Sequence, residues 1–187
     1  MDLFPQHGFS LCGGGCLSLF YLVIHISIPL SKKGALSRLL TWPKKGRTIG
    51  KAMGFWTTQL AWWGTILYPF FSPIRTDTYL FYTGIAIYLV GIAFTIKALW
   101  TYASSPDDQP IVQGLYQFSR NPIYVAYTFI GYGIGISIGS WILVVLHTIE
   151  VIACHFVILD EERYCIERYG PEYQKYQKRV PRYFWKL

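Results

Sequence analysis

Long apolar stretches constrain the fold of this chain more than any other feature of its sequence. A helix needs about 20 apolar residues to cross the hydrocarbon core of a bilayer. Three stretches have that length, and two shorter ones are separated only by Gly139 and Ser140. The sequence therefore predicts an all-α, polytopic integral membrane protein of about five transmembrane helices, with a C-terminal helical hairpin and then a cytoplasmic helical tail. The stretches cover residues 9–30, 53–72, 78–100, 122–139 and 141–159.

Composition agrees with a single membrane domain over residues 1–187. Charged residues make up 14% of the chain, well below the roughly 25% of soluble domains. Aromatic residues reach 18%, which is typical of side chains that lie at the bilayer interfaces. Residues 1–103 hold three predicted helices and a basic loop, and residues 104–187 hold the polar clusters described below. The four cysteines lack the spacing of a zinc site, so we expect no metal.

The basic loop predicts how the chain lies across the membrane. No acid interrupts the run, and its apolar flanks favour a cytoplasmic membrane-surface loop over a nucleic-acid patch. The N-terminus is then outside, and residues 102–121 share the cytoplasmic side with the tail from residue 160 on. The cations of the loop are Lys32, Lys33, Arg38, Lys44, Lys45, Arg47 and Lys51.

Glycines recur at every fourth position in the fourth stretch. Gly131, Gly135 and Gly139 would share one face of a helix. Small residues in this pattern let the backbone of a second helix approach closely. We therefore expect this face to pack against another helix.

A first polar cluster covers residues 113–124, where the chain enters the fourth stretch. Gly114 gives the backbone freedom to bring amides to a ligand, and Pro122 suits the first turn of a helix. Arg120 lies just before the membrane, where it can bind a carboxylate. The alternative is an ordinary interfacial turn whose arginine reaches toward water.

A second cluster is the acidic run Asp160, Glu161 and Glu162. We expect it at the cytoplasmic end of the fifth helix, where acids oppose the helix dipole. A cationic ligand or Arg120 would relieve that repulsion. The alternative is that the acids pair in water with nearby cations or begin a separate polar helix.

The tail carries a third, basic cluster at residues 178–183. Before it, Gly170 and Pro171 predict the end of one helix and the start of another. The cluster is either an anion clamp at the mouth of a site or a contact with anionic lipid headgroups.

Two ionisable residues lie inside the fifth stretch. His147 and Glu150 are three residues apart and can share a helix face. Intramembrane ionisable groups are candidates for function, but we favour a structural hydrogen bond for this pair.

The order and spacing of the clusters from residue 113 to residue 183 resemble those of membrane-embedded methyltransferases, namely the isoprenylcysteine carboxyl methyltransferases and the phospholipid (phosphatidylethanolamine) N-methyltransferases. Their signature is Gly-x-Tyr-x-x-x-Arg-His-Pro-x-Tyr, followed by paired acids and a tyrosine-rich tail. Asn121 stands where the signature has histidine, and Ala126 where it usually has glycine. The Gly-x-Gly element of the phospholipid enzymes is missing near residues 100–108. The matching residues are Gly114, Tyr116, Arg120, Asn121, Pro122, Tyr124, Glu161, Glu162, Tyr169, Gly170, Tyr173, Tyr176, Arg179, Val180 and Pro181.

The resemblance implies S-adenosylmethionine as methyl donor, a lipid or other hydrophobic acceptor, and a cofactor-binding and catalytic half at residues 104–187. In this picture Arg120 binds the carboxylate of the cofactor, and Glu161 or Glu162 binds its ammonium or ribose hydroxyls. Arg179 or Arg120 orients an anionic acceptor, whereas Glu161 or Glu162 takes the proton of an amine acceptor. We expect catalytic roles for Arg120, Arg179 and Glu162. The implied cofactor-binding residues are Gln113, Gly114, Leu115, Tyr116, Arg120, Asn121, Pro122, Tyr124, Glu161 and Glu162.

Two other functions remain open from the sequence. The tail also resembles that of NADPH-dependent membrane sterol reductases, with Cys165 in place of their cysteine, although those proteins are usually longer. A non-catalytic membrane scaffold is the second alternative. The small number of intramembrane charges argues against a channel.

Overall fold

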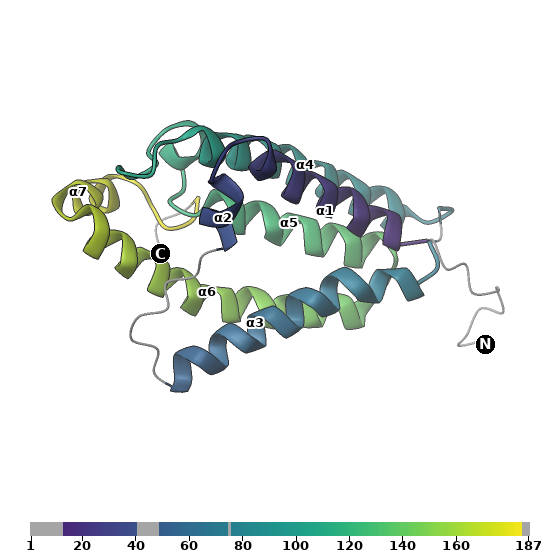
Figure 1. Cartoon of the computed structure of the whole chain (residues 1–187). Helices are drawn as coiled ribbons and strands as arrows, with labels where there is room; N and C mark the ends of the chain where they lie inside the picture. The colour runs from purple at the N-terminus through teal and green to yellow at the C-terminus, as the bar shows by residue number, and fades with distance from the viewer. Residues whose placement is uncertain (1–12, 41–48, 75, 185–187) are drawn as a thin grey trace.

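The computed structural model describes residues 13–40, 49–74 and 76–184. The described residues form helices and connecting segments without a strand, so the all-helical prediction is confirmed (Figure 1). Lys44, Lys45 and Arg47 of the basic loop lie outside the described residues. The elements are α1 (Gly15–Leu30), α2 (Ala35–Leu40), α3 (Ile49–Leu67), η1 (Tyr68–Phe71), α4 (Tyr79–Ser104), η2 (Gly114–Gln117), α5 (Pro122–Ser137), α6 (Trp141–Tyr169) and α7 (Pro171–Arg179).

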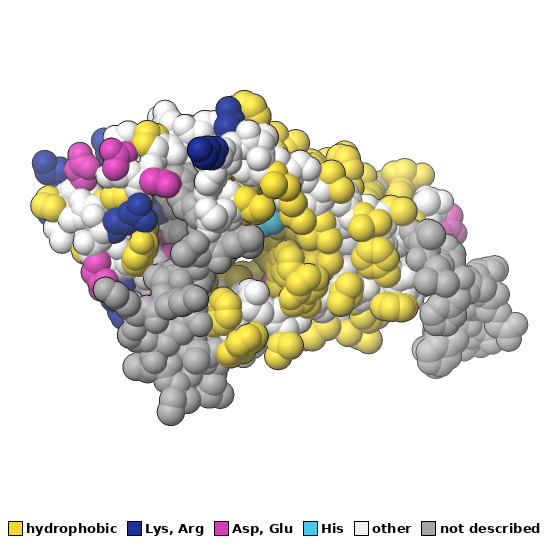
Figure 2. All heavy atoms as spheres, viewed as in Figure 1, with side chains coloured by type: hydrophobic (Ala, Val, Ile, Leu, Met, Phe, Trp, Pro, Cys, Tyr) yellow, Lys and Arg dark blue, Asp and Glu magenta, His cyan; other side chains and the backbone are white. Residues whose placement is uncertain are grey.

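Two of the described helices, α4 and α6, are long and apolar enough to cross a membrane. With 26 and 29 residues and a rise of 1.5 Å per residue, each is about 40 Å long. Figure 2 shows hydrophobic side chains over the middle of the visible face and charged side chains gathered at the end that carries α7. This distribution fits an apolar middle in lipid and a polar end in water.

The helices lie in two groups. Figure 1 shows α1, α4 and α5 together, with α3 and α6 beside each other below them. Helix α5 packs against both α4 and α6, and α3 packs against α6. The buried core between the groups includes Tyr21, Ile66, Tyr88, Ile130 and Leu143.

Glycines let α5 approach both of its neighbours. Towards α4, a Cβ added to Gly133 would lie 2.6 Å from the backbone nitrogen of Tyr88. Towards α6, a Cβ on Gly131 would collide with the His147 ring, and one on Gly135 would meet Val144. The predicted close packing is thus confirmed for Gly131 and Gly135.

Gly139 does not belong to that packed face. It follows the end of α5 with φ of 68°, and a Cβ placed on it would meet nothing within 4 Å. The positive φ explains the glycine, because this conformation is costly for residues with a Cβ.

Helix α6 does not end at the acidic run, so the prediction of a separate polar helix from Asp160 is wrong. It runs from Trp141 to Tyr169, and the side chain of its N-cap, Ser140, accepts a hydrogen bond from the backbone N–H of Leu143. It contains no glycine or proline, and the first break comes at Gly170, with φ of 57°. Pro171 then begins α7, as predicted. The three acids therefore lie within α6, just beyond its apolar part, rather than at its C-terminal end.

Candidate functional site

Glu162 is the centre of a buried polar cluster at the polar end of the molecule. Its carboxylate accepts hydrogen bonds from Arg120 Nε at 3.0 Å and Nη2 at 3.1 Å, and from Asn121 Nδ2 at 3.0 Å. Arg182 adds two more, from Nε at 3.1 Å and Nη2 at 3.0 Å. Glu162 is only 3% exposed, and a buried charge needs partners of this kind. We call Arg120, Asn121, Glu162 and Arg182 the Glu162 cluster.

Arg120 also fastens the end of α7. Its Nη1 donates to the carbonyl oxygens of Gln177 at 3.1 Å and Val180 at 2.6 Å, and its backbone N–H donates to Pro181 at 2.9 Å. The last carbonyls of a helix have no partner within the helix, so Arg120 completes the C-terminal end of α7. All three guanidinium nitrogens of Arg120 are therefore bonded to protein oxygens.

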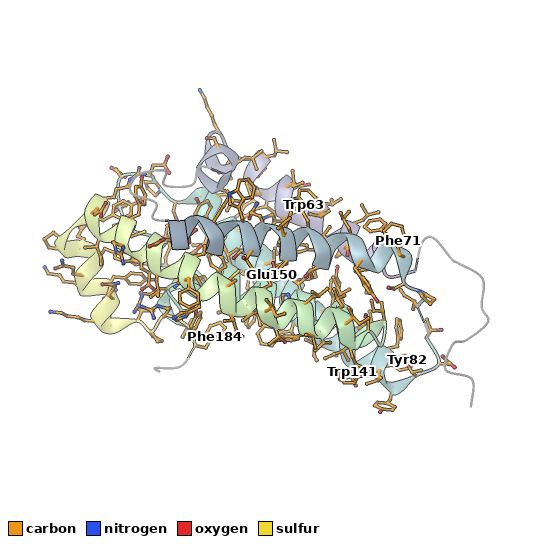
Figure 3. All side chains as sticks on the ribbon, turned by 90° about the horizontal axis from the view of Figure 1, so that it is seen from below. Trp63, Phe71, Tyr82, Trp141, Glu150 and Phe184 are labelled. Atoms are coloured by element: carbon orange, nitrogen blue, oxygen red, sulfur yellow. The ribbon has the colours of Figure 1, made fainter. Side chains whose placement is uncertain are left out.

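The segment after α7 folds back over the start of α5. The carbonyl of Arg182 accepts from Ser119 Oγ at 3.1 Å and from Asn121 Nδ2 at 3.2 Å. The Tyr183 hydroxyl then lies 2.8 Å from His155 Nδ1 on α6, and Phe184 packs against Phe94 of α4. In Figure 3, Phe184 lies beside α6. The segment thus contacts the start of α5 and the middle parts of α4 and α6.

Glu161 has a different environment from its neighbour. Its Oε1 accepts one hydrogen bond, from the Tyr124 hydroxyl of α5 at 2.8 Å. Successive helical residues point about 100° apart, which explains why Glu162 meets the arginines and Glu161 does not. Within the described residues, Glu161 Oε2 receives no hydrogen bond.

The signature segment before α5 rests on α7. The Tyr176 hydroxyl donates to the carbonyl of Tyr116 at 2.6 Å. Burial raises the pKa of Tyr176 and of its neighbour Tyr173, so both hydroxyls stay protonated and can donate. Gly114 has φ of 60°, and a Cβ there would lie 2.7 Å from Thr101 Oγ1. A glycine is therefore required where the segment packs against Thr101 of α4.

A polar hollow lies between α7 and the segment at residues 109–112. Its volume is about 170 Å³. One wall is fixed because the carbonyl of Asp107 accepts from Arg168 Nη2 at 2.8 Å and from the Tyr169 hydroxyl at 3.2 Å. The lining residues are Gln109, Pro110, Val112, Glu172, Lys175, Tyr176 and Arg179.

The structure brings together most of the residues that the sequence singled out. Arg120 and Asn121 meet Glu162, and Tyr124 meets Glu161. Tyr116 is buried and Pro122 begins α5, whereas Gln113 is exposed and donates weakly to Ser105 at 3.4 Å. Leu115 lies in η2. Arg179 lines the hollow and makes no ion pair with the Glu162 cluster.

Two contributors were not identified as site residues from the sequence. Arg182 appeared only as one cation of a basic run, and Ser119 only as part of the signature segment. Their partners lie 20 and 63 residues away. Sequence spacing gives no signal for contacts at such separations.

A second buried cluster lies deeper along α6, and we call it the Glu150 cluster. Glu150 accepts from the Tyr127 hydroxyl at 2.8 Å and the Thr65 hydroxyl at 3.0 Å, and lies 3.1 Å from His147 Nδ1. The predicted contact between His147 and Glu150 is thus confirmed. Figure 3 shows Glu150 within the bundle where α3 and α6 lie together. In the described part of the chain, no group of three His, Cys, Asp or Glu residues could hold a metal ion.

The comparison with protein-family models agrees with the signature. A family model described as phospholipid methyltransferase matches residues 76–172, which is just over half of the chain and includes α4, α5 and α6. No curated protein and no solved structure matches the chain. The match confirms the resemblance to membrane methyltransferases and does not favour the reductase or the scaffold. The chain belongs to the phospholipid methyltransferase family, which implies a membrane methyltransferase acting on lipid.

Proposed function

We propose that this protein is an S-adenosylmethionine-dependent methyltransferase that acts on a lipid or other hydrophobic acceptor at the cytoplasmic face of the membrane. The observation that carries the proposal is the contrast between two adjacent glutamates. Glu162 is fully engaged by Arg120, Asn121 and Arg182, whereas Glu161 has one partner, Tyr124. The sequence motif therefore provides one carboxylate for structure and one for chemistry.

Glu161 fits a cationic ligand. Its Oε1 is held by Tyr124, and the described residues leave Oε2 free to accept a hydrogen bond from an ammonium group. Hydrogen bonds between charged partners are stronger than neutral ones. Glu161 can thus bind the ammonium of the cofactor, or take the proton that an amine acceptor must lose.

We assign Arg120 and Glu162 to positioning rather than to direct contact with the cofactor. Their bonds join the start of α5, the polar part of α6 and the end of α7. Tyr124 lies in the first turn of α5, just after Arg120, so the same bonds fix the place of Tyr124 and Glu161. This assignment differs from the roles that the resemblance implies for Arg120 and Glu162.

When bound, S-adenosylmethionine supplies an activated methyl group on its sulfonium. Methyl transfer is an in-line displacement that depends mainly on alignment of donor and acceptor. The protein must therefore hold two ligands in one geometry and exclude water. The rigid junction around Glu162, next to Tyr124 and Glu161, is suited to that task. We expect the acceptor to enter from the bilayer and the cofactor from the cytoplasm.

Ligand-dependent stability of the detergent-purified protein tests the proposal. A ligand that binds only the folded state stabilises it by about 2.7 kcal/mol at 100 times its Kd. S-adenosylhomocysteine should raise the thermal midpoint, and NADPH should not. Stabilisation by NADPH alone would refute the methyltransferase and support the reductase.

A matched pair of variants tests the role of Glu161. Glu161→Gln removes the charge but keeps an acceptor for Tyr124, whereas Glu167→Gln changes an exposed position of the same helix. Loss of one charge-assisted hydrogen bond corresponds to about 1.5–3 kcal/mol. We expect Glu161→Gln to weaken S-adenosylhomocysteine binding at least tenfold and Glu167→Gln to leave it unchanged. Equal affinities would show that Glu161 does not bind the cofactor ammonium and would leave it only the role of proton acceptor.

A further inference from the structure

The hollow between α7 and residues 109–112 has two fixed walls. On one side, the carbonyl of Asp107 is held by Arg168 and Tyr169 of α6. On the other, the Tyr176 hydroxyl fastens α7 to the carbonyl of Tyr116. The hollow of about 170 Å³ therefore lies between two segments that are both anchored to the rest of the protein.

The wall formed by α7 carries charges of both signs. Glu172, Lys175 and Arg179 recur at intervals of three and four residues, so they share the face of α7 that lines the hollow. Their side chains make no hydrogen bond or ion pair with another described residue. An acid thus precedes two cations along one helix face, and all three face a space large enough for a small ligand.

We propose that this hollow binds a zwitterion, with its ammonium at Glu172 and its anionic group, a carboxylate or a phosphate, between Lys175 and Arg179. Three residues of helix rise by about 4.5 Å. That separation suits a ligand whose ammonium and anionic groups are joined by one or two carbons. A simple anion would meet the repulsion of Glu172, and a simple cation would meet two like charges.

The occupancy of Arg120 supports this assignment, which here rests on the proposed function. All three guanidinium nitrogens of Arg120 bind protein oxygens, so the cofactor carboxylate needs another cation. Lys175 and Arg179 meet that need beside the signature segment. The other source of the same chemistry is the phosphate and ammonium of a phospholipid headgroup.

Calorimetric titration of the detergent-purified full chain tests the proposal and separates the two sources. S-adenosylhomocysteine represents the amino-acid zwitterion, and methylthioadenosine is the same nucleoside without it. Glycerophosphoethanolamine represents the headgroup, and glycerol 3-phosphate lacks its ammonium. The double variant Lys175→Gln/Arg179→Gln removes the cations. Lys178→Gln is the matched control, because Lys178 is exposed on α7 and does not line the hollow.

We expect the double variant to lower the affinity for one of the two zwitterions at least tenfold. Lys178→Gln should change that affinity less than twofold. Glu172→Gln should lower the affinity for the same zwitterion but not the affinity for the matching compound without an ammonium. If binding of S-adenosylhomocysteine is the one affected, the hollow holds the amino-acid end of the cofactor, and Glu161 takes the proton of an amine acceptor instead of binding the cofactor ammonium. If binding of glycerophosphoethanolamine is the one affected, the hollow holds a headgroup.

Unchanged affinity for both zwitterions in the double variant and in Glu172→Gln would overturn the proposal. That result, with S-adenosylhomocysteine still bound, would leave the methyltransferase function standing. Conversely, binding of glycerophosphoethanolamine through Lys175 and Arg179 without any binding of S-adenosylhomocysteine would support the hollow as a zwitterion site. The same result would contradict the proposed dependence on S-adenosylmethionine. Glu172→Gln alone keeps the test decisive if the double variant does not fold.

Discussion

Helix α6 buries two glutamates, and their surroundings differ in kind. Glu162, beyond the apolar part of the helix, is surrounded by two arginines and an amide. Glu150, twelve residues earlier, is surrounded by two hydroxyls and an imidazole. At 1.5 Å per residue, about 18 Å of helix separates them.

The difference follows from what each region has to join. The Glu162 cluster connects segments that leave the apolar layer, namely the start of α5 and the chain around α7. Charged side chains lose less hydration free energy there because water is near. The Glu150 cluster joins α3, α5 and α6 within the apolar part, where uncompensated charge is expensive. We infer that the first cluster shapes the site and the second aligns the helices that carry it.

The largest expected effect is on the Glu162 cluster. Glu162→Ala leaves the charge of Arg120, whose side chain is only 9% exposed, without its anionic partner, and breaking such a buried pair costs about 3–5 kcal/mol. Denaturant unfolding in detergent should show this loss, together with loss of S-adenosylhomocysteine binding. Glu167→Ala, an exposed change on the same helix, should stay within about 0.5 kcal/mol of the parent. Similar stability of the two variants would contradict a structural role for Glu162.

Glu150→Ala should have a smaller effect of a different kind. It removes three hydrogen-bonding contacts, and such bonds within membranes average about 0.6 kcal/mol each, or about 2 kcal/mol together. S-adenosylhomocysteine affinity, measured below the unfolding temperature, should stay within about twofold of the parent. A loss of affinity as large as that of Glu162→Ala would abolish the distinction between the two clusters.

Gly131→Ala tests the packing that positions the Glu150 cluster. Its Cβ would collide with the His147 ring, and overpacking costs about 1–3 kcal/mol. The higher helix propensity of alanine offsets about 1 kcal/mol, so we expect a net loss of about 1 kcal/mol. Gly64→Ala on α3, where a Cβ meets nothing within 4 Å, is the control and should not lose stability. A stabilised Gly131→Ala variant would show that the His147 ring moves freely.

Tyr124→Phe should lower stability as little as Gly131→Ala does. It removes the hydrogen bond to Glu161, a loss of about 1 kcal/mol. S-adenosylhomocysteine affinity should fall by a similar free energy, about fivefold, because Glu161 loses its orientation. Tyr132→Phe, which removes a hydroxyl contact with Thr148, is the control. Titration of both variants with S-adenosylhomocysteine separates the loss of a buried hydroxyl contact from the loss of Glu161 orientation. Equal affinities would place the ligand elsewhere.

Sequence reasoning was most successful where local patterns decide the structure. The apolar stretches gave the positions of the helices, and Gly170 with Pro171 gave the boundary between α6 and α7. The orientation of the chain across the membrane stays a prediction. The continuation of α6 past Asp160 was missed because Glu162 is stabilised there by Arg120 and Arg182, which lie 42 and 20 residues away.

The residues of the candidate site were predictable from the sequence, but the hydrogen-bonding partner of each residue was not. The signature brought Arg120, Tyr124, Glu161 and Glu162 together. It could not decide which glutamate meets the arginine, because a rotation of about 100° per residue separates them and the packing of α6 against α5 sets that rotation. For the same reason, the hydrogen bonds from Arg120 to carbonyl oxygens at the end of α7 could not be predicted from the sequence.

The glycine contacts of α4 and α5 have a mechanical consequence. Cβ atoms on Gly91 and Gly133 would lie 2.9 and 2.6 Å from backbone nitrogens of the facing helix, so these two helices touch along their main chains. Neither helix can slide or tilt against the other without a backbone collision, so α4 and α5 behave as one rigid pair. We therefore expect any passage that opens toward the bilayer for an acceptor to come from displacement of α1, α3 or α6 against this pair, with α4 and α5 as its fixed frame.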